Sequence, residues 1–404
     1  MQPTAVSQVI EALGKLVLGL FFAVFAKRMG CNIESCAAYA ALGLTAGSFL
    51  CMVYLLLTKS LTRLAIPNIR QVVSVDSFGS IFKRLFFLAV PVTLSSSLSG
   101  ITRVIDMSMI FRRLQSIGYE SSVAAAMYGC YSTLAVPVYN LPSSFVAGIS
   151  LSLVPMLTAA VEAKDAKRST DLMISSLKMC LFFSLPCSFG IAVFAKPLLS
   201  LLFVGEQTSV AVAAPLLTVL SFSVCSSCLM GVTNAVLQAY RKVSLPIVSM
   251  FLGTAIKIVS AYLLMGIPSI GIYGAAISTL FGNTVAVGLN LYFIDRKIVA
   301  DIDVLKISLP SVVASFLAVG ISFGVWRLLC IKFLEGIGLL FSILICVLLY
   351  LYIGGRMGIY SEREIGLLPG GKHLLRFLLV IGLIKKQKEK DKKHEQRGYC
   401  KKTS

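Results

Sequence analysis

The stretch "FFLAVPVTLSSSLSGITRVIDMSMIFRRL", Phe86 to Leu114, poses the question that decides the fold. Its apolar run is long enough to cross a bilayer, which takes roughly 20 residues of helix. It nevertheless carries Arg103 and Asp106, three residues apart. Each ionised side chain costs about 2.5–3.5 kcal/mol at the centre of a membrane helix. Whether this cost applies depends on the solvent that surrounds the chain.

Composition identifies that solvent as a lipid bilayer. Of the 404 residues, 57% are hydrophobic and 14% are charged, against about 45–50% and about 25% in soluble domains. The excess extends along the whole chain, which predicts an all-α fold, a polytopic helical membrane bundle of about ten transmembrane helices. The predicted segments cover residues 5–26, 36–57, 85–110, 123–158, 172–195, 210–239, 244–265, 270–294, 305–329 and 334–353.

The fourth segment, 123–158, is too long for one simple span. It contains "VPVYNLP", Val136 to Pro142, and proline removes a backbone donor and kinks a helix. We therefore expect the helix to break at this motif, where the surrounding protein or a cavity must satisfy the freed backbone groups.

The net charge of +19 is distributed as in a membrane protein. Lys and Arg are richer in every second gap between apolar segments, and nine of them lie in the last twenty residues. The positive-inside rule places these gaps, and both termini, in the cytoplasm. The basic tail then lies beside anionic lipid, which we favour over a nucleic-acid partner.

Sequence motifs for enzymatic or metal chemistry are missing. The eleven cysteines include one CxxC, Cys225 to Cys228, inside an apolar run, and both histidines, His373 and His394, follow the last segment. A zinc site needs more ligands than this, and no phosphate-binding loop or nucleophile–base pair occurs. We predict a protein that is not an enzyme and has no resident cofactor; a coupling cation remains open.

Arg103 and Asp106 allow two interpretations. At spacing i, i+3 they share one helix face and can neutralise one another as a structural salt bridge. Alternatively they face a polar cavity, where a cation would bind an anionic pyrophosphate head group. Ionisable residues inside a membrane are functional candidates by default, and we favour the cavity.

Further candidates for the same cavity lie in other segments. Glu11 and Lys15 are spaced i, i+4 in the first segment, and Lys257 lies in the middle of the seventh. Asn140, next to Pro142 in the fourth segment, could bond freed carbonyls or sugar hydroxyls. The candidate substrate-binding set is therefore Arg103, Asp106, Lys257, Lys15, Glu11 and Asn140, with no catalytic residue and no metal ligand.

A weak internal echo relates the first and seventh segments. "QVIEALGKLVLGLFF" (8–22) resembles "FLGTAIKIVSAYLL" (251–264) when Lys15 is laid over Lys257, and each is followed by a segment rich in small residues. The echo is explained either by an internal repeat, as in many transporters, or by small residues that let helices pack closely.

Several stretches together resemble a known family. They are "QPTAVSQVIEALGKLVLGLF" (2–21), "AVPVTLSSSLSGITRVIDMSMIFRRL" (89–114), "YGCYSTLAVPVYNLPSSFVAGISLSLVPML" (128–157), "LQAYRKVSLPIVSMFLGTAIKIVSAYLL" (237–264) and "GIYGAAISTL" (271–280). In this order they are similar to the stage V sporulation protein B group of the MOP superfamily of polysaccharide and lipid-linked oligosaccharide flippases. The resemblance extends to about Pro369.

The resemblance implies fourteen helices in the family, as two six-helix lobes and a terminal pair. Here residues 1–58 resemble the end of the first lobe, a basic loop covers 59–84, a complete second lobe covers 85–294, the terminal pair covers 305–353, and a basic tail covers 354–404. The family's first four helices have no counterpart. Either a longer protein begins upstream of Met1, or the protein is shortened.

The resemblance implies a flippase that moves a lipid-linked oligosaccharide or cell-wall precursor across the bacterial cytoplasmic membrane by alternating access. The pyrophosphate would be held by Lys15, Arg103 and Lys257. The carboxylates of Asp106 and Glu11 would set the electrostatic field of the cavity or hold a cation. Two alternatives remain: a MATE-type multidrug/cation antiporter, and a non-transporting scaffold of envelope or spore-coat assembly.

Overall fold

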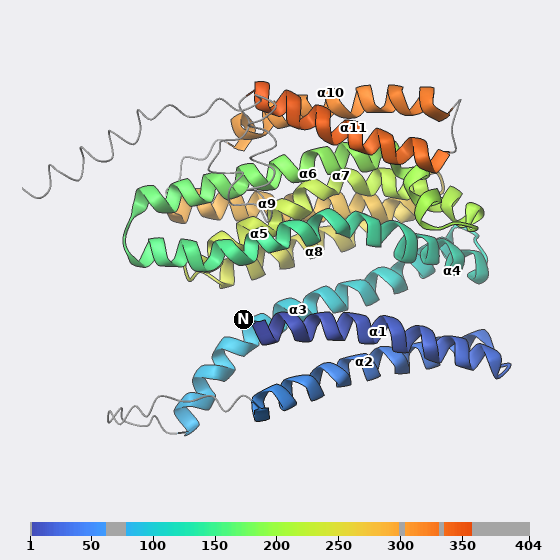
Figure 1. Cartoon of the computed structure of the whole chain (residues 1–404), viewed down its shortest axis with the longest axis horizontal. Coiled ribbons are helices and arrows are strands. Elements are labelled where there is room, and N and C mark those ends of the chain that lie inside the picture. The colour runs from blue at the N-terminus through green and yellow to red at the C-terminus, as the bar shows by residue number, and fades with distance from the viewer. Residues whose placement is uncertain (1, 62–77, 299–303, 331–334, 358–404) are drawn as a thin grey trace, which may run out of the picture. The chain divides into compact units, whose positions relative to one another are not determined.

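A computed structural model describes residues 2–61, 78–298, 304–330 and 335–357 (Figure 1). These residues form eleven α-helices and one π-helical turn and contain no strand, which confirms the predicted all-α fold. The basic tail, the two histidines and most of the loop between 59 and 84 lie outside the described residues. The chain forms two compact units, Met1–Ser80 and Ile81–Ser404.

The first unit is a helical hairpin of α1 (Gln2–Arg28) and α2 (Ile33–Leu61). The two helices lie so close that a Cβ atom on Gly43 would be 2.5 Å from the Leu18 carbonyl oxygen, and one on Gly47 would collide with the Lys15 backbone. Glycine at these positions lets the backbones touch, as in other membrane helix pairs.

The second unit contains the remaining helices. They are α3 (Phe78–Ser116), α4 (Ser121–Gly129), the π-helical turn η1 (Cys130–Ala135), α5 (Val136–Glu162), α6 (Ala166–Leu202), α7 (Gln207–Ala239), α8 (Ser244–Met265), α9 (Tyr273–Ile298), α10 (Val304–Cys330) and α11 (Glu335–Arg356). Helix α7 packs against α5, α6 and α9, α8 packs against α9, and α10 and α11 pack on α6. The largest core cluster surrounds α7.

Nine helices in the described part of the chain are long and apolar enough to cross a membrane. They account for nine of the ten predicted segments. The remaining predicted segment, 85–110, falls on α3, a helix of 39 residues that is not among these nine. The protein is thus a multi-pass membrane protein, as its composition predicts.

The predicted break at "VPVYNLP" is wrong in position. Helix α5 continues through Pro142, and the irregularity lies one turn earlier, at the π-helical residues Cys130–Ala135. Pro137 follows directly, in the first turn of α5. A proline ring clashes with the carbonyl four residues before it. The wider π turn, with its extra residue, is a known way to insert such an irregularity without ending a helix.

Candidate functional site

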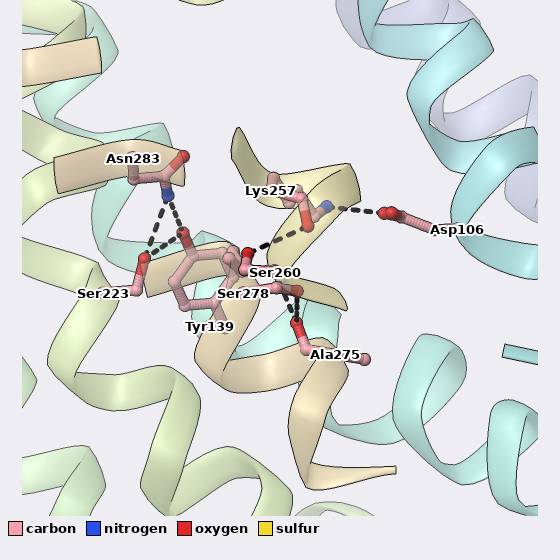
Figure 2. A network of polar contacts seen from close by, with 9 residues as sticks. Asp106, Tyr139, Ser223, Lys257, Ser260, Ala275, Ser278 and Asn283 are labelled. Carbon is pink, nitrogen blue, oxygen red and sulfur yellow. Dashed lines mark hydrogen bonds and ion pairs between the residues drawn. The ribbon is translucent and has the colours of Figure 1, made fainter. Parts of the chain in front are cut away.

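The most buried ion pair between described residues joins helices α3 and α8. Lys257 Nζ lies 2.5 Å from Asp106 Oδ2, and each side chain is only 17% exposed. Figure 2 shows the two side chains extending toward one another from their helices. The pair joins residues 151 positions apart in the sequence, so no local pattern could have predicted it.

This geometry excludes the structural salt bridge that the spacing of Arg103 and Asp106 allows. No ion pair connects these two described residues, and the Asp106 carboxylate is taken by Lys257. Arg103 is exposed on α3, one turn before Asp106. The reason is that Lys257 reaches the carboxylate from a facing helix, whereas Arg103 would have to fold back along its own. Arg103 therefore presents a cation beside the pair.

A second contact fastens α3 to α8. The Arg113 guanidinium lies 3.6 Å from the centre of the Tyr262 ring, and its Nε donates a hydrogen bond of 3.0 Å to the Tyr262 carbonyl oxygen. A Cβ atom on Gly266 would lie 3.0 Å from Arg113 Nη2, so glycine leaves room for the guanidinium. The stacking of Arg113 on Tyr262 was not predicted from the sequence.

The order of the two contacts along the chain shows the relative direction of the two helices. From Asp106 to Arg113 on α3, the partners advance from Lys257 to Tyr262 on α8. Helices α3 and α8 are therefore parallel. This agrees with their being the third and seventh predicted segments, since odd-numbered segments of a polytopic chain cross the membrane in one direction.

Close packing of α8 and α9 holds Lys257 in place. A Cβ atom on Gly282 would lie 2.8 Å from Lys257 Cβ, and one on Gly253 would lie 2.6 Å from the Gly282 carbonyl oxygen. The Lys257 carbonyl oxygen also accepts a hydrogen bond of 3.1 Å from Ser260 Oγ. The lysine stem is thus fixed against α9, and its ammonium is aimed at α3.

A polar network continues into the bundle from α9. Asn283 Nδ2 donates to Tyr139 Oη on α5 and to Ser223 Oγ on α7, both at 2.9 Å (Figure 2). Tyr139 and Ser223 are buried. Hydrogen bonds between membrane helices fix their relative positions. Asn283 was not among the sequence candidates because an isolated asparagine in an apolar run has no distinguishing pattern.

The first unit holds another ion pair, between the candidate residues Glu11 and Lys15. Lys15 Nζ lies 2.6 Å from Glu11 Oε1 within α1, and Ser48 Oγ on α2 donates to the same carboxylate oxygen at 3.4 Å. The side chains are 40% and 34% exposed. The i, i+4 spacing therefore does produce contact, and the pair lies on an open face of this unit.

Asn140 is exposed on α5, and its side chain makes no hydrogen bond to another described residue. Its carbonyl oxygen accepts a bond of 3.0 Å from Ser144 Oγ, while Pro142 is buried. The interpretation that Asn140 bonds carbonyls freed around Pro142 is not supported by these contacts. A role in binding sugar hydroxyls stays a prediction.

Within the described residues, no group of three His, Cys, Asp or Glu side chains could hold a metal ion. The CxxC cysteines make weak hydrogen bonds to serine hydroxyls instead. Ser184 Oγ lies 3.7 Å from Cys225 Sγ, and Ser143 Oγ lies 3.7 Å from Cys228 Sγ. These contacts fit small packing residues.

A multi-pass helical protein with a buried ion pair between the spanning helix α8 and its neighbour α3 belongs to the class of membrane transport proteins, since intramembrane charges mark substrate and ion pathways. The family model described as "Lipid II flippase MurJ" matches residues 3–351. The chain belongs to this family and is a membrane flippase.

Individual relatives agree with this assignment. An uncharacterized membrane protein of Bacillus subtilis (strain 168), YabM, is 28% identical over 386 residues, which is 94% of this chain and 70% of that protein. Stage V sporulation protein B of the same organism is 24% identical over 284 residues, 70% of this chain and 53% of that protein. The superfamily in the resemblance is thus confirmed, whereas the narrower group is a distant relative.

A solved structure shares the fold. The lipid II flippase MurJ in an inward closed conformation superposes with a TM-score of 0.58 at 18% identity, over 87% of this chain and 67% of that one. At this identity the likeness establishes the helical arrangement alone. The lobe boundaries inferred from the sequence stay predictions.

Proposed function

We propose that this flippase moves a lipid-linked oligosaccharide or peptidoglycan precursor across the bacterial cytoplasmic membrane by alternating access. The observation that carries the proposal is the Lys257–Asp106 pair between α3 and α8. Its family relatives include proteins described as lipid II flippases. Such a substrate has a diphosphate, which requires cationic partners in a polar site.

The ion pair couples anion binding to helix movement. In the observed geometry the Lys257 ammonium is satisfied by Asp106. A diphosphate entering beside Arg103 competes with that carboxylate for the same ammonium. When it wins, one of the two polar contacts described between α3 and α8 is lost. The substrate thus favours a state in which α3 has moved, which is the differential affinity that any transport cycle needs.

The remaining sequence assignments are part of the same proposal. Both termini lie in the cytoplasm, α1 and α2 correspond to the end of a first lobe, residues 85–294 form the second lobe, and the α10–α11 pair offers an apolar surface to the lipid tail. Transport involves no covalent step, no catalytic residue and no nucleic-acid partner; anionic lipid contacts the basic tail. Lys15, Glu11 and Asn140 belong to the cavity as predictions.

The test is lipid flipping in proteoliposomes with a fluorescent undecaprenyl-pyrophosphate sugar. We expect Lys257→Ala and Arg103→Ala to weaken the apparent affinity about tenfold or more, because a hydrogen bond to a charged group contributes about 1.5–3 kcal/mol. Lys196→Ala is the matched control, since Lys196 is an exposed lysine on α6.

Other results would redirect the assignment. Normal flipping by Lys257→Ala would leave the ion pair with a structural role only. The chain spans about 70% of the YabM relative, so a version extended upstream is compared in parallel if the gene encodes one. If neither length moves lipid, drug efflux and binding to envelope proteins test the antiporter and scaffold alternatives.

A further inference from the structure

The Asn283 amide on α9 is anchored from one side by two hydroxyl groups. Its Nδ2 donates a hydrogen bond of 2.9 Å to Tyr139 Oη on α5 and another of 2.9 Å to Ser223 Oγ on α7. Tyr139 and Ser223 are buried, and Figure 2 shows the oxygen end of the amide turned away from both hydroxyls. Both amide hydrogens are used, and turning the side chain would break two bonds at once. The direction of Asn283 Oδ1 is therefore fixed by two neighbouring helices.

That oxygen has no hydrogen-bond partner among the residues that the structure describes, yet it is not enclosed. The buried side-chain atoms without a partner in the described part of the chain are Asn290 Oδ1 and Trp326 Nε1. Asn283 is only partly buried, and its oxygen is not among these atoms. The carbonyl oxygen of a side-chain amide has two lone pairs. Asn283 thus presents an accepting group, in the orientation observed, that a ligand can reach.

The position of Asn283 relates it to the ion pair. It directly follows Gly282, where α9 meets Lys257: a Cβ atom on Gly282 would lie 2.8 Å from Lys257 Cβ. The amide and the lysine therefore lie at the same level of the α8–α9 pair. At this level the bundle offers a cation from α8 and a neutral acceptor from α9.

The chemistry of an amide oxygen selects hydrogen-bond donors. The oxygen carries a partial negative charge, so it does not attract phosphate oxygens, which are acceptors themselves. Its matching partners are the hydroxyl groups of a sugar and the N–H of an N-acyl group. A site that hydrogen-bonds a substrate hydroxyl or N–H discriminates against an analogue that lacks it.

We propose that Asn283 is a specificity-determining residue, which accepts a hydrogen bond from a hydroxyl or amide N–H of the sugar on the lipid-linked substrate. Tyr139 and Ser223 are its positioning residues. The inference rests on the proposed function and adds a division of roles to it. The cations bind the diphosphate that all such lipids share, whereas Asn283 distinguishes a lipid that carries a sugar from one that does not.

Competition binding to the full chain in detergent tests this division. Unlabelled undecaprenyl pyrophosphate, with and without a sugar, displaces the fluorescent undecaprenyl-pyrophosphate sugar. We expect the wild type to bind the sugar-bearing lipid more tightly. Asn283→Leu should reduce this preference roughly three- to tenfold, the value of one hydrogen bond. Lys257→Ala should weaken both lipids by the same factor and leave the preference unchanged.

Two further variants keep the test decisive. Asn290→Leu removes the next amide along α9, whose oxygen is buried, and should leave the preference for sugar intact. Asn283→Ser serves if Asn283→Leu fails to fold, because its hydroxyl can still bond within the network but is too short to present the acceptor. A wild type without preference, or an unchanged preference in the Asn283 variants, would overturn this inference while the proposed function stands. A wild type that binds neither lipid would overturn both.

Discussion

At the scale of the residue, the Lys257–Asp106 pair explains how two charges can lie within the membrane part of the chain. Each ion alone costs about 2.5–3.5 kcal/mol at mid-membrane, and mutual attraction over 2.5 Å offsets much of this. Pairing is therefore a condition for inserting either residue. The same dependence makes the pair sensitive to an incoming anion, which offers the ammonium a different partner.

The pairing gives a prediction for stability. Lys257→Leu or Asp106→Leu alone should destabilise the protein by about 3–5 kcal/mol, because each leaves a buried charge without its partner. The double variant should lose much less than the sum, since no charge remains. Unfolding in detergent, arranged as a double-mutant cycle, measures the difference. Additive effects would show that the residues do not interact.

Residue identity could be predicted from the sequence better than residue pairing. Lys257 and Asp106 stand out because charges are rare in apolar runs, and the Glu11–Lys15 contact follows from helical spacing. A salt bridge between Arg103 and Asp106 was one of two interpretations, because only local neighbours are visible in a sequence. The true partner comes from a helix 151 positions away, and its reach depends on how closely α8 packs against α9.

At the scale of the element, glycine sets the distance between paired helices. The α1–α2 and α8–α9 pairs both close through a glycine that contacts a lysine of the facing helix: Gly47 contacts the Lys15 backbone, and Gly282 contacts Lys257 Cβ. The two segments of the internal echo thus both take part in close helix packing at glycine, and whether they also form an internal repeat stays a prediction. In the second pair this packing also aims a functional side chain.

A pair of glycine substitutions on α9 tests this. Gly282→Ala puts a methyl group 2.8 Å from Lys257 Cβ and from the Gly253 carbonyl oxygen, so we expect a loss of about 1–3 kcal/mol from overpacking and weaker flipping. Gly288→Ala meets nothing within 4 Å and should be neutral or stabilise the helix by up to about 1 kcal/mol. Equal thermal stability of the two variants would contradict this account.

The sequence was enough to predict where the helices lie, but not where a helix departs from α-helical geometry. Long apolar runs predicted each of the nine spanning helices, because a bilayer admits few structures other than a helix. The proline motif after Val136 indicated a disturbance, but the π turn at Cys130–Ala135 absorbs it upstream. Its position depends on the contacts of this turn with α7, which the local sequence does not contain.

At the scale of the whole molecule, the distribution of Lys and Arg predicts the orientation of the chain in the membrane. The loop between α5 and α6 contains Lys164 and is followed by Lys167 and Arg168, whereas the loop between α6 and α7 contains Glu206. The positive-inside rule assigns the first to the cytoplasm and the second to the outside. The parallel course of α3 and α8 supports an alternating path across the membrane but does not choose its direction.

Labelling of introduced cysteines in intact cells determines which side of the membrane each loop faces. In a version whose accessible native cysteines are replaced, Glu206→Cys should react with a membrane-impermeant maleimide, and Lys164→Cys should react only after permeabilisation. Both positions are exposed in short loops next to helix ends, so differences in labelling report the side of the membrane. The reverse pattern would place both termini outside. It would also reverse the side from which a precursor made in the cytoplasm approaches the Lys257–Asp106 pair.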